Sequence, residues 1–267
     1  MPLVRLPHSE TFYVEEGSGT ALVLVHGMGG DHTVWDWQVP ALRDRFRILR
    51  PDILGHGRSE KPPAPWTFAQ FAQQIAELLD RLAIPRAIVA GFSLGGTIGQ
   101  AFAADYPDRI AALIVVSSAC ARTAEEQAAV DARVAQVAAG GPPAVVDGAL
   151  KRWFTDGFSR KHPALIEYWR QRLLANDPAP YSAVYRLYSE VDRQLLHRLG
   201  EIRAPTLVIT GDNDPGQTPR MARELARRIA DSELQIFPGV PHMLTLEAAD
   251  QLNAAIADFA QRRVAGV

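Results

Sequence analysis

The stretch AGFSLGGT (residues 90–97) decides how the rest of the sequence is interpreted. In it, Ser93 lies between Gly91 and Gly95, after an apolar run and before a stretch with helical spacing. A G-x-S-x-G turn between a strand and a helix is so sharp that larger side chains at the glycine positions would clash, and the serine is held in a strained conformation. The N-terminus of the following helix favours negative charge at the same point. We therefore predict that Ser93 is a nucleophile at the edge of a sheet.

The apolar runs on either side of this turn predict a parallel sheet, because continuous Val, Ile and Leu runs are typical of strands buried on both faces. The predicted strands lie within residues 21–30, 45–53, 86–93, 110–119, 205–212 and 233–239. Apolar residues at helical spacing occur between or after them, within residues 68–82, 94–106 and 249–259. This alternation predicts an α/β fold, with a mostly parallel sheet covered by helices on both faces.

One segment, residues 121–200, interrupts the alternation, because it contains no convincing strand and many aromatic residues. We interpret it as a helical cap inserted into a core domain formed by residues 1–120 and 201–267. Parallel sheets bind ligands at the carboxyl ends of their strands, and an insertion over that edge would cover the site. Some of its aromatic residues are then expected to face a pocket; they are Trp153, Phe154, Phe158, Tyr168, Trp169, Tyr181, Tyr185 and Tyr188.

Composition excludes several classes of protein. The formal net charge of −2 argues against a nucleic-acid-binding surface, which usually needs an excess of basic residues. Cys120 is the only cysteine, so the chain cannot form an internal disulfide, and this fits a reducing compartment. The N-terminal residues lack the apolar stretch of a signal peptide, and no run approaches the roughly 18 apolar residues of a membrane span. We expect a cytoplasmic protein with neither a membrane nor a nucleic-acid partner, and we leave its oligomeric state open.

A nucleophilic serine needs a base and an acid that orients the base. Of the seven histidines, we predict His242 as the base, because it follows a predicted strand in FPGVPHMLTLEA. The loop TGDNDPGQTP after the preceding strand offers Asp212 and Asp214. We predict Asp214 as the acid because it lies farther out in the loop, and we expect Asp212 to bond amides of the turn.

The negative charge that develops during attack by a serine also needs hydrogen-bond donors. The glycine-rich segment VHGMGG (residues 25–30) follows a predicted strand, on the same edge of the sheet as Ser93. The backbone N–H groups of Met28 and Leu94 are therefore predicted to form an oxyanion hole.

These motifs appear in the order Ser93, Asp214, His242, and the sequence resembles the α/β-hydrolase superfamily over almost its whole length outside residues 121–200. The resemblance implies an eight-stranded, mostly parallel sheet with a helical cap. DILGHGRSE (residues 52–60) is similar to a loop that is mainly structural in this superfamily. We therefore assign no catalytic role to Asp52, Gly55 or Gly57.

Within the superfamily, KRWFTDGF (residues 151–158) and YSAVYRLYSEVD (residues 181–192) are similar to small bacterial carboxylesterases and 3-oxoadipate enol-lactonases. This resemblance implies hydrolysis of a small carboxylic ester or lactone through an acyl-enzyme, without a metal or organic cofactor. The pocket is then expected to be lined by Arg152, Trp153, Phe154 and Tyr181.

An enol-lactone substrate carries a carboxylate, and its pocket should offer a cation. The candidates are Arg152, Arg186 and Arg193. Three alternatives stay open at this point: hydrolysis of a carbon–carbon bond in a diketone ring-cleavage product, cofactor-free perhydrolase activity, and a non-catalytic ligand receptor on the same fold.

Overall fold

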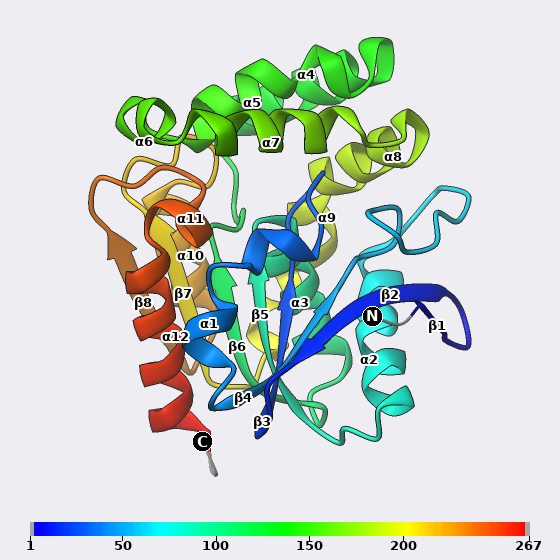
Figure 1. Cartoon of the computed structure of the whole chain (residues 1–267), viewed down its shortest axis with the longest axis vertical. Coiled ribbons are helices and arrows are strands. Elements are labelled where there is room, and N and C mark those ends of the chain that lie inside the picture. Colours follow the sequence, from blue (N-terminus) through cyan, green and yellow to red (C-terminus); the bar gives the residue numbers. More distant parts are fainter. Residues whose placement is uncertain (1–2, 265–267) are drawn as a thin grey trace.

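The computed structural model describes residues 3–264, which contain one eight-stranded sheet (Figure 1). The strands are β1 (Leu3–Arg5), β2 (Glu10–Glu16), β3 (Thr20–Val25), β4 (Phe46–Pro51), β5 (Ala87–Phe92), β6 (Ile110–Val116), β7 (Thr206–Gly211) and β8 (Ser232–Phe237). They follow the order β1-β2-β4-β3-β5-β6-β7-β8 across the sheet. The strands from β3 to β8 pair in parallel, whereas β1 and β2 pair antiparallel at one edge. The predicted α/β-hydrolase fold is confirmed, and the antiparallel pair β1–β2 is the part that was not predicted.

Helices cover both faces of the sheet, because side chains alternate between the faces along each strand. On β3, Val23 and Val25 pack with the helices α2 (Phe68–Arg81), α3 (Leu94–Asp105) and α10 (Pro219–Arg228). Leu22 and Leu24 face the other way and pack with α1 (Val39–Leu42), α11 (Leu244–Glu247) and α12 (Ala249–Arg263). The sheet is therefore the middle layer of three, and its strand ends project the loops that carry the site.

The described residues between β6 and β7 form helices and contain no strand. These helices are α4 (Ala124–Gly140), η2 (Pro142–Ala144), α5 (Val146–Trp153), α6 (Asp156–Lys161), α7 (Pro163–Leu174), α8 (Pro178–Ser189), α9 (Val191–Leu195) and η3 (Leu196–Glu201). Figure 1 shows α4 to α8 gathered at one end of the molecule, beyond the end of the sheet. In the described part of the chain, no helix combines the length and apolar character needed to cross a bilayer.

Candidate active site

The turn between β5 and α3 has the strained geometry that its sequence predicts. Ser93 has a φ of 55° and a ψ of −116°, a backbone conformation that residues other than glycine rarely adopt. The flanking glycines are required by close approach: a Cβ on Gly91 would overlap the Gly95 carbonyl oxygen, and one on Gly95 would overlap that of Val25. The Ser93 N–H donates to the Val116 carbonyl over 2.8 Å, which ties the turn to β6.

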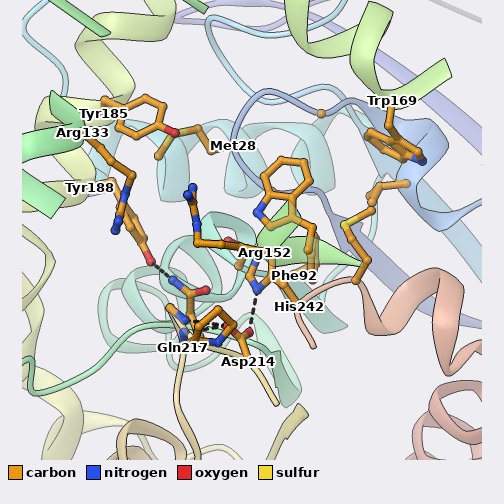
Figure 2. Close-up of a pocket in the computed structure, with 18 of the residues that line it drawn as sticks. Met28, Phe92, Arg133, Arg152, Trp169, Tyr185, Tyr188, Asp214, Gln217 and His242 are labelled. Atoms are coloured by element: carbon orange, nitrogen blue, oxygen red, sulfur yellow. Dashed lines mark hydrogen bonds and ion pairs between the residues drawn. The ribbon is translucent and has the colours of Figure 1, made fainter. Parts of the chain in front are cut away.

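Asp214 and His242 lie in the loops after β7 and β8 and form a buried pair (Figure 2). Nδ1–H of His242 donates to Oδ2 of Asp214 over 2.7 Å. Oδ1 of Asp214 accepts the N–H groups of Gly216 and Gln217, each over 2.9 Å. Burial raises the pKa of Asp214, but the His242 ring and these hydrogen bonds outweigh it and hold the pKa below its ordinary value. The ionised carboxylate thus fixes the ring with its proton on Nδ1, which leaves Nε2 free to take a proton.

The nearby Asp212 has a different position. Its Oδ1 accepts the Gly239 N–H over 2.7 Å, and its side chain is exposed. Asp212 therefore fastens the turn after β8, as expected, while Asp214 contacts the histidine.

Ser93, Asp214 and His242 line one pocket, together with side chains from the helices between β6 and β7. Three of the four side chains predicted to line the pocket are there: Arg152, Trp153 and Tyr181. Five of the aromatic residues from this segment line it: Trp153, Trp169, Tyr181, Tyr185 and Tyr188. The Trp153 ring lies 5.9 Å from the His242 ring, measured between centroids, so an aromatic wall borders the proposed base.

The prediction that Phe154 lines this pocket is wrong. Phe154 is buried in the core and stacks on Phe158, with 5.5 Å between ring centroids. The physical reason is that α5 ends at Trp153 and the backbone is extended at Phe154. The side chains of Trp153 and Phe154 therefore leave the backbone in different directions.

Two arginines line the pocket, one of which the sequence did not reveal. Figure 2 shows Arg133 of α4 and Arg152 of α5 near each other in the pocket, close to Tyr188. Neither guanidinium forms an ion pair or hydrogen bond with another described residue. Burial and the nearby Arg133 lower the pKa of Arg152. The pocket thus holds two neighbouring positive charges, and no carboxylate within residues 3–264 is paired to either.

The other two candidate cations, Arg186 and Arg193, do not line this pocket. Arg186 lines a separate surface groove. Arg193 is 73% exposed and pairs with Glu190 over 2.6 Å. Of the three candidate cations, Arg152 alone lines the pocket, because the side chains of Arg186 and Arg193 are exposed on α8 and α9.

The residues predicted to form an oxyanion hole flank Ser93. Met28 lines the pocket, in the loop after β3, and Leu94 is the first residue of α3. The backbone N–H groups of both residues donate no hydrogen bond to any other described residue. The first N–H groups of a helix have no partner within the helix, which leaves that of Leu94 available.

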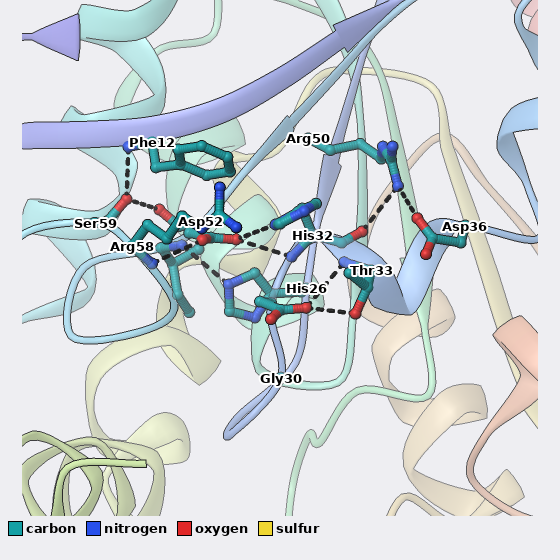
Figure 3. Close-up of polar contacts among 12 residues, drawn as sticks. Phe12, His26, Gly30, His32, Thr33, Asp36, Arg50, Asp52, Arg58 and Ser59 are labelled. Atoms are coloured by element: carbon teal, nitrogen blue, oxygen red, sulfur yellow. Dashed lines mark hydrogen bonds and ion pairs between the residues drawn. The ribbon is translucent and has the colours of Figure 1, made fainter. Parts of the chain in front are cut away.

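The loop that was predicted to be structural is held by polar contacts around Asp52 (Figure 3). Asp52 accepts hydrogen bonds from the backbone N–H and Nδ1–H of His32, over 2.9 and 2.8 Å, and from the Arg58 N–H over 2.9 Å. Gly57 has a φ of +51°, and a Cβ there would overlap the Asp52 carboxylate. These contacts hold backbone in place, and none of these residues lines the pocket.

Among residues 3–264, no cluster of three or more His, Cys, Asp or Glu side chains is arranged to hold a metal ion. Apart from the hydroxyl groups of its tyrosines, the pocket contains the Ser93 hydroxyl, one imidazole–carboxylate pair and two guanidinium groups.

Comparison with known proteins places this geometry in context. Residues 20–249 match the family model described as the alpha/beta hydrolase fold. The chain is 30% identical over 236 residues to 3-oxoadipate enol-lactonase 2 of Acinetobacter baylyi, covering 88% of this chain and 86% of that protein. The crystal structure of an enol-lactonase from Burkholderia xenovorans matches with a TM-score of 0.89 and 30% identity, over 97% of this chain and 100% of the other.

A thermophilic esterase from Thermogutta terrifontis, whose structure has malate bound, matches with a TM-score of 0.87 and 28% identity. The match covers 96% of this chain and 94% of that one.

Proposed function

Because the chain belongs to the α/β-hydrolase family, we propose that it is a serine hydrolase that cleaves a small carboxylic ester or lactone carrying a free carboxylate. The observation that carries the proposal is that Ser93, the Asp214–His242 pair and two unpaired arginines all line one pocket.

In the proposed reaction, Nε2 of His242 takes the proton of the Ser93 hydroxyl as Oγ attacks the carbonyl carbon. Asp214 stabilises the resulting imidazolium, and the N–H groups of Met28 and Leu94 hold the oxyanion. The imidazolium then protonates the departing alkoxide, which leaves an acyl group on Ser93. Water, deprotonated by His242, attacks this acyl group and releases the carboxylic acid. In a lactone the alcohol and acid products remain one molecule.

The two arginines support an acidic substrate. A guanidinium withdrawn from water without a counter-ion is unfavourable, and a carboxylate is the anion whose geometry suits it best. Arg133 and Arg152 have no such partner among the described residues, so a bound carboxylate would supply it. Two of the relatives point the same way, since one is named for 3-oxoadipate and another has malate bound, and both compounds are dicarboxylic acids.

We further propose that residues 121–200 act as a cap over this pocket. In this view the sheet supplies the reacting groups, and the inserted helices supply Arg133, Arg152 and the aromatic wall. The cap would then set which esters or lactones enter, while the core sets the reaction.

The experiment that tests this proposal follows acid release in a pH-stat with a short neutral ester, a neutral lactone and an enol-lactone that carries a carboxylate. We expect the acidic lactone to have the highest kcat/KM, and we expect Ser93→Ala to lower kcat by roughly 10⁴- to 10⁶-fold. Equal rates for wild type and Ser93→Ala on all three substrates would contradict the proposed mechanism. In that case a vinylogous diketone would be assayed next, because carbon–carbon hydrolysis uses the same fold.

A further inference from the structure

One carbonyl group of the loop after β3, that of Gly27, is held by a buried histidine. His26 accepts the Ile53 N–H at Nε2 over 3.0 Å, so its proton lies on Nδ1. Nδ1–H donates to the Gly27 carbonyl over 2.8 Å, and the Gly30 N–H donates to the same oxygen over 3.2 Å. Figure 3 shows His26 and Gly30 beside the polar contacts of Asp52.

The same loop is held from the opposite side by α7 of the inserted segment. Nδ2 of Asn176, just beyond the end of α7, donates to the Gly29 carbonyl over 2.9 Å. Arg172, one helical turn earlier, donates from Nη2 to the Gly30 carbonyl over 2.9 Å and from Nε to Asp31 over 2.6 Å. Burial raises the pKa of Asp31, but Arg172 and Thr33 outweigh it and lower the pKa to about 2, so the ion pair persists at neutral pH.

Peptide geometry connects these contacts to the proposed oxyanion hole. In a trans peptide, the C=O of one residue and the N–H of the next point in opposite directions, and none of these peptides is cis. Asn176 fixes the Gly29 carbonyl, which directs the Gly30 N–H the other way, onto the Gly27 carbonyl. The Gly27 carbonyl is in turn opposite the Met28 N–H. Holding Gly29 from α7 therefore sets the direction of the Met28 N–H, two peptides away.

The loop needs such anchors because its sequence supplies little stiffness. Gly29 has a φ of +73° and is followed by a second glycine, and glycine backbone has more conformational freedom to lose than any other. A Cβ on Gly29 would come within 2.8 Å of Leu173, also on α7, so glycine lets the loop approach the helix. Hydrogen bonds are therefore needed to restrict the backbone conformations that Gly29 and Gly30 would otherwise sample.

We propose that Asn176 and Arg172 are positioning residues that orient the Met28 N–H toward the developing oxyanion. This inference rests on the proposed serine-hydrolase function. It gives the inserted helices a part in transition-state stabilisation, in addition to any part in substrate selection.

The test compares Asn176→Ala and Arg172→Lys with Arg170→Ala, a control on the same helix whose side chain pairs with Asp147 at the surface. For each protein we would measure kcat and KM on the best ester, and the affinity for a trifluoromethyl ketone that forms a tetrahedral adduct with Ser93. We expect Asn176→Ala to lower kcat by about 10- to 100-fold with KM within about twofold, because a donor displaced by about 1 Å loses its contact with the oxyanion. Affinity for the ketone should fall in parallel, Arg172→Lys should act in the same direction, and Arg170→Ala should match wild type.

Hydrogen exchange of the peptide that covers residues 26–31 gives a readout without turnover. We expect faster exchange in Asn176→Ala than in Arg170→Ala. The inference is overturned if Asn176→Ala melts at a lower temperature but keeps the wild-type kcat, ketone affinity and loop exchange, since Asn176 would then serve stability alone. If wild type itself forms no adduct at Ser93, the proposed function fails and the inference falls with it, a result that the variants cannot mimic.

Discussion

Oδ2 of Asp214 lies 2.7 Å from Nδ1 of His242, whereas Asp212, two residues earlier, bonds the N–H of Gly239. The two carboxylates therefore have separable roles. We expect Asp214→Asn to lower kcat by roughly 10⁴-fold, because an amide cannot stabilise the imidazolium and favours the wrong tautomer. Asp212→Asn is the matched control and should keep kcat within a few-fold of wild type. Steady-state assays of both variants check this, and the opposite ranking would show that the acid is misassigned.

The unpaired arginines of the pocket predict a charge-dependent loss of substrate affinity. We expect Arg152→Gln and Arg133→Gln each to raise KM for an acidic ester by about 10- to 100-fold, the value of a charge-assisted hydrogen bond of about 1.5–3 kcal/mol. KM for a neutral ester of the same size should stay within about twofold. Arg193→Gln, at an exposed ion pair, is the control and should change neither value. Equal effects on acidic and neutral esters would mean that these arginines shape the pocket without binding a carboxylate.

The buried histidines behind the site predict that stability falls in mild acid. Burial and the neighbouring His26 lower the pKa of His56 to about 3, while a histidine in the unfolded chain has its ordinary pKa of 6.5. The unfolded state therefore binds more protons between these values, so stability is complete above pH 6.5 and is lost as the pH falls. Between pH 6.5 and pH 4.5, one such histidine lowers the free energy of unfolding by about 2–3 kcal/mol.

Urea unfolding at a series of pH values between 8 and 4.5 checks this prediction. His56→Gln should show a weaker pH dependence over this range than wild type. His197→Gln, at an exposed position, should keep the wild-type slope. A flat wild-type profile over the same range would rule out a neutral, buried His56. Glutamates whose pKa is lowered in the folded state begin to contribute near the acid end of this range, but they contribute equally to wild type and to both variants, so the difference in slope reports His56.

The glycines of the turn around Ser93 predict a large packing penalty for any larger side chain at their positions. A Cβ at Gly95 would overlap the Val25 carbonyl, and backbone on both sides leaves little room to relax. We expect Gly95→Ala to lower the free energy of unfolding by about 3 kcal/mol, at the upper end of overpacking effects. Gly200→Ala is the control, because no atom from outside its own stretch of backbone lies within 4 Å of its added Cβ. Chemical denaturation of the two variants measures the difference, and similar values would contradict the close approach seen here.

The parallel strands and the positions of Ser93, Asp214 and His242 could be predicted because their signals are local. The strands β3, β5, β6 and β7 are short apolar runs, β4 and β8 are weaker patterns that end at Pro51 and just before Pro238, and each of these three residues follows one of the strands. The strands β1 and β2 were missed because β1 has three residues and is largely exposed, and β2 has acidic residues at both ends. Neither reads as a continuous apolar run.

The wall of the pocket contributed by the inserted helices could not be predicted in the same way. Whether an arginine or an aromatic residue faces the pocket depends on how several short helices pack, which composition does not specify. Arg133 lies in the Ala-rich helix α4, and its neighbours in the sequence give no sign that it faces a pocket. Trp153 and Phe154 are adjacent aromatic residues, and their environments differ because α5 ends between them. Arg186 and Arg193 carried the same charge as Arg152 and pointed elsewhere.

The contacts of Arg172 and Asn176 with the loop after β3 have a consequence for chimeric enzymes. The inserted helices come from one uninterrupted stretch of chain, which suggests that they can be exchanged between relatives as a cassette. Yet a grafted cassette would arrive with its own residues facing the carbonyls of Gly29 and Gly30. The unit that can be transplanted is therefore the cassette together with the loop after β3 that it contacts. These two pieces of chain lie about a hundred residues apart in this sequence.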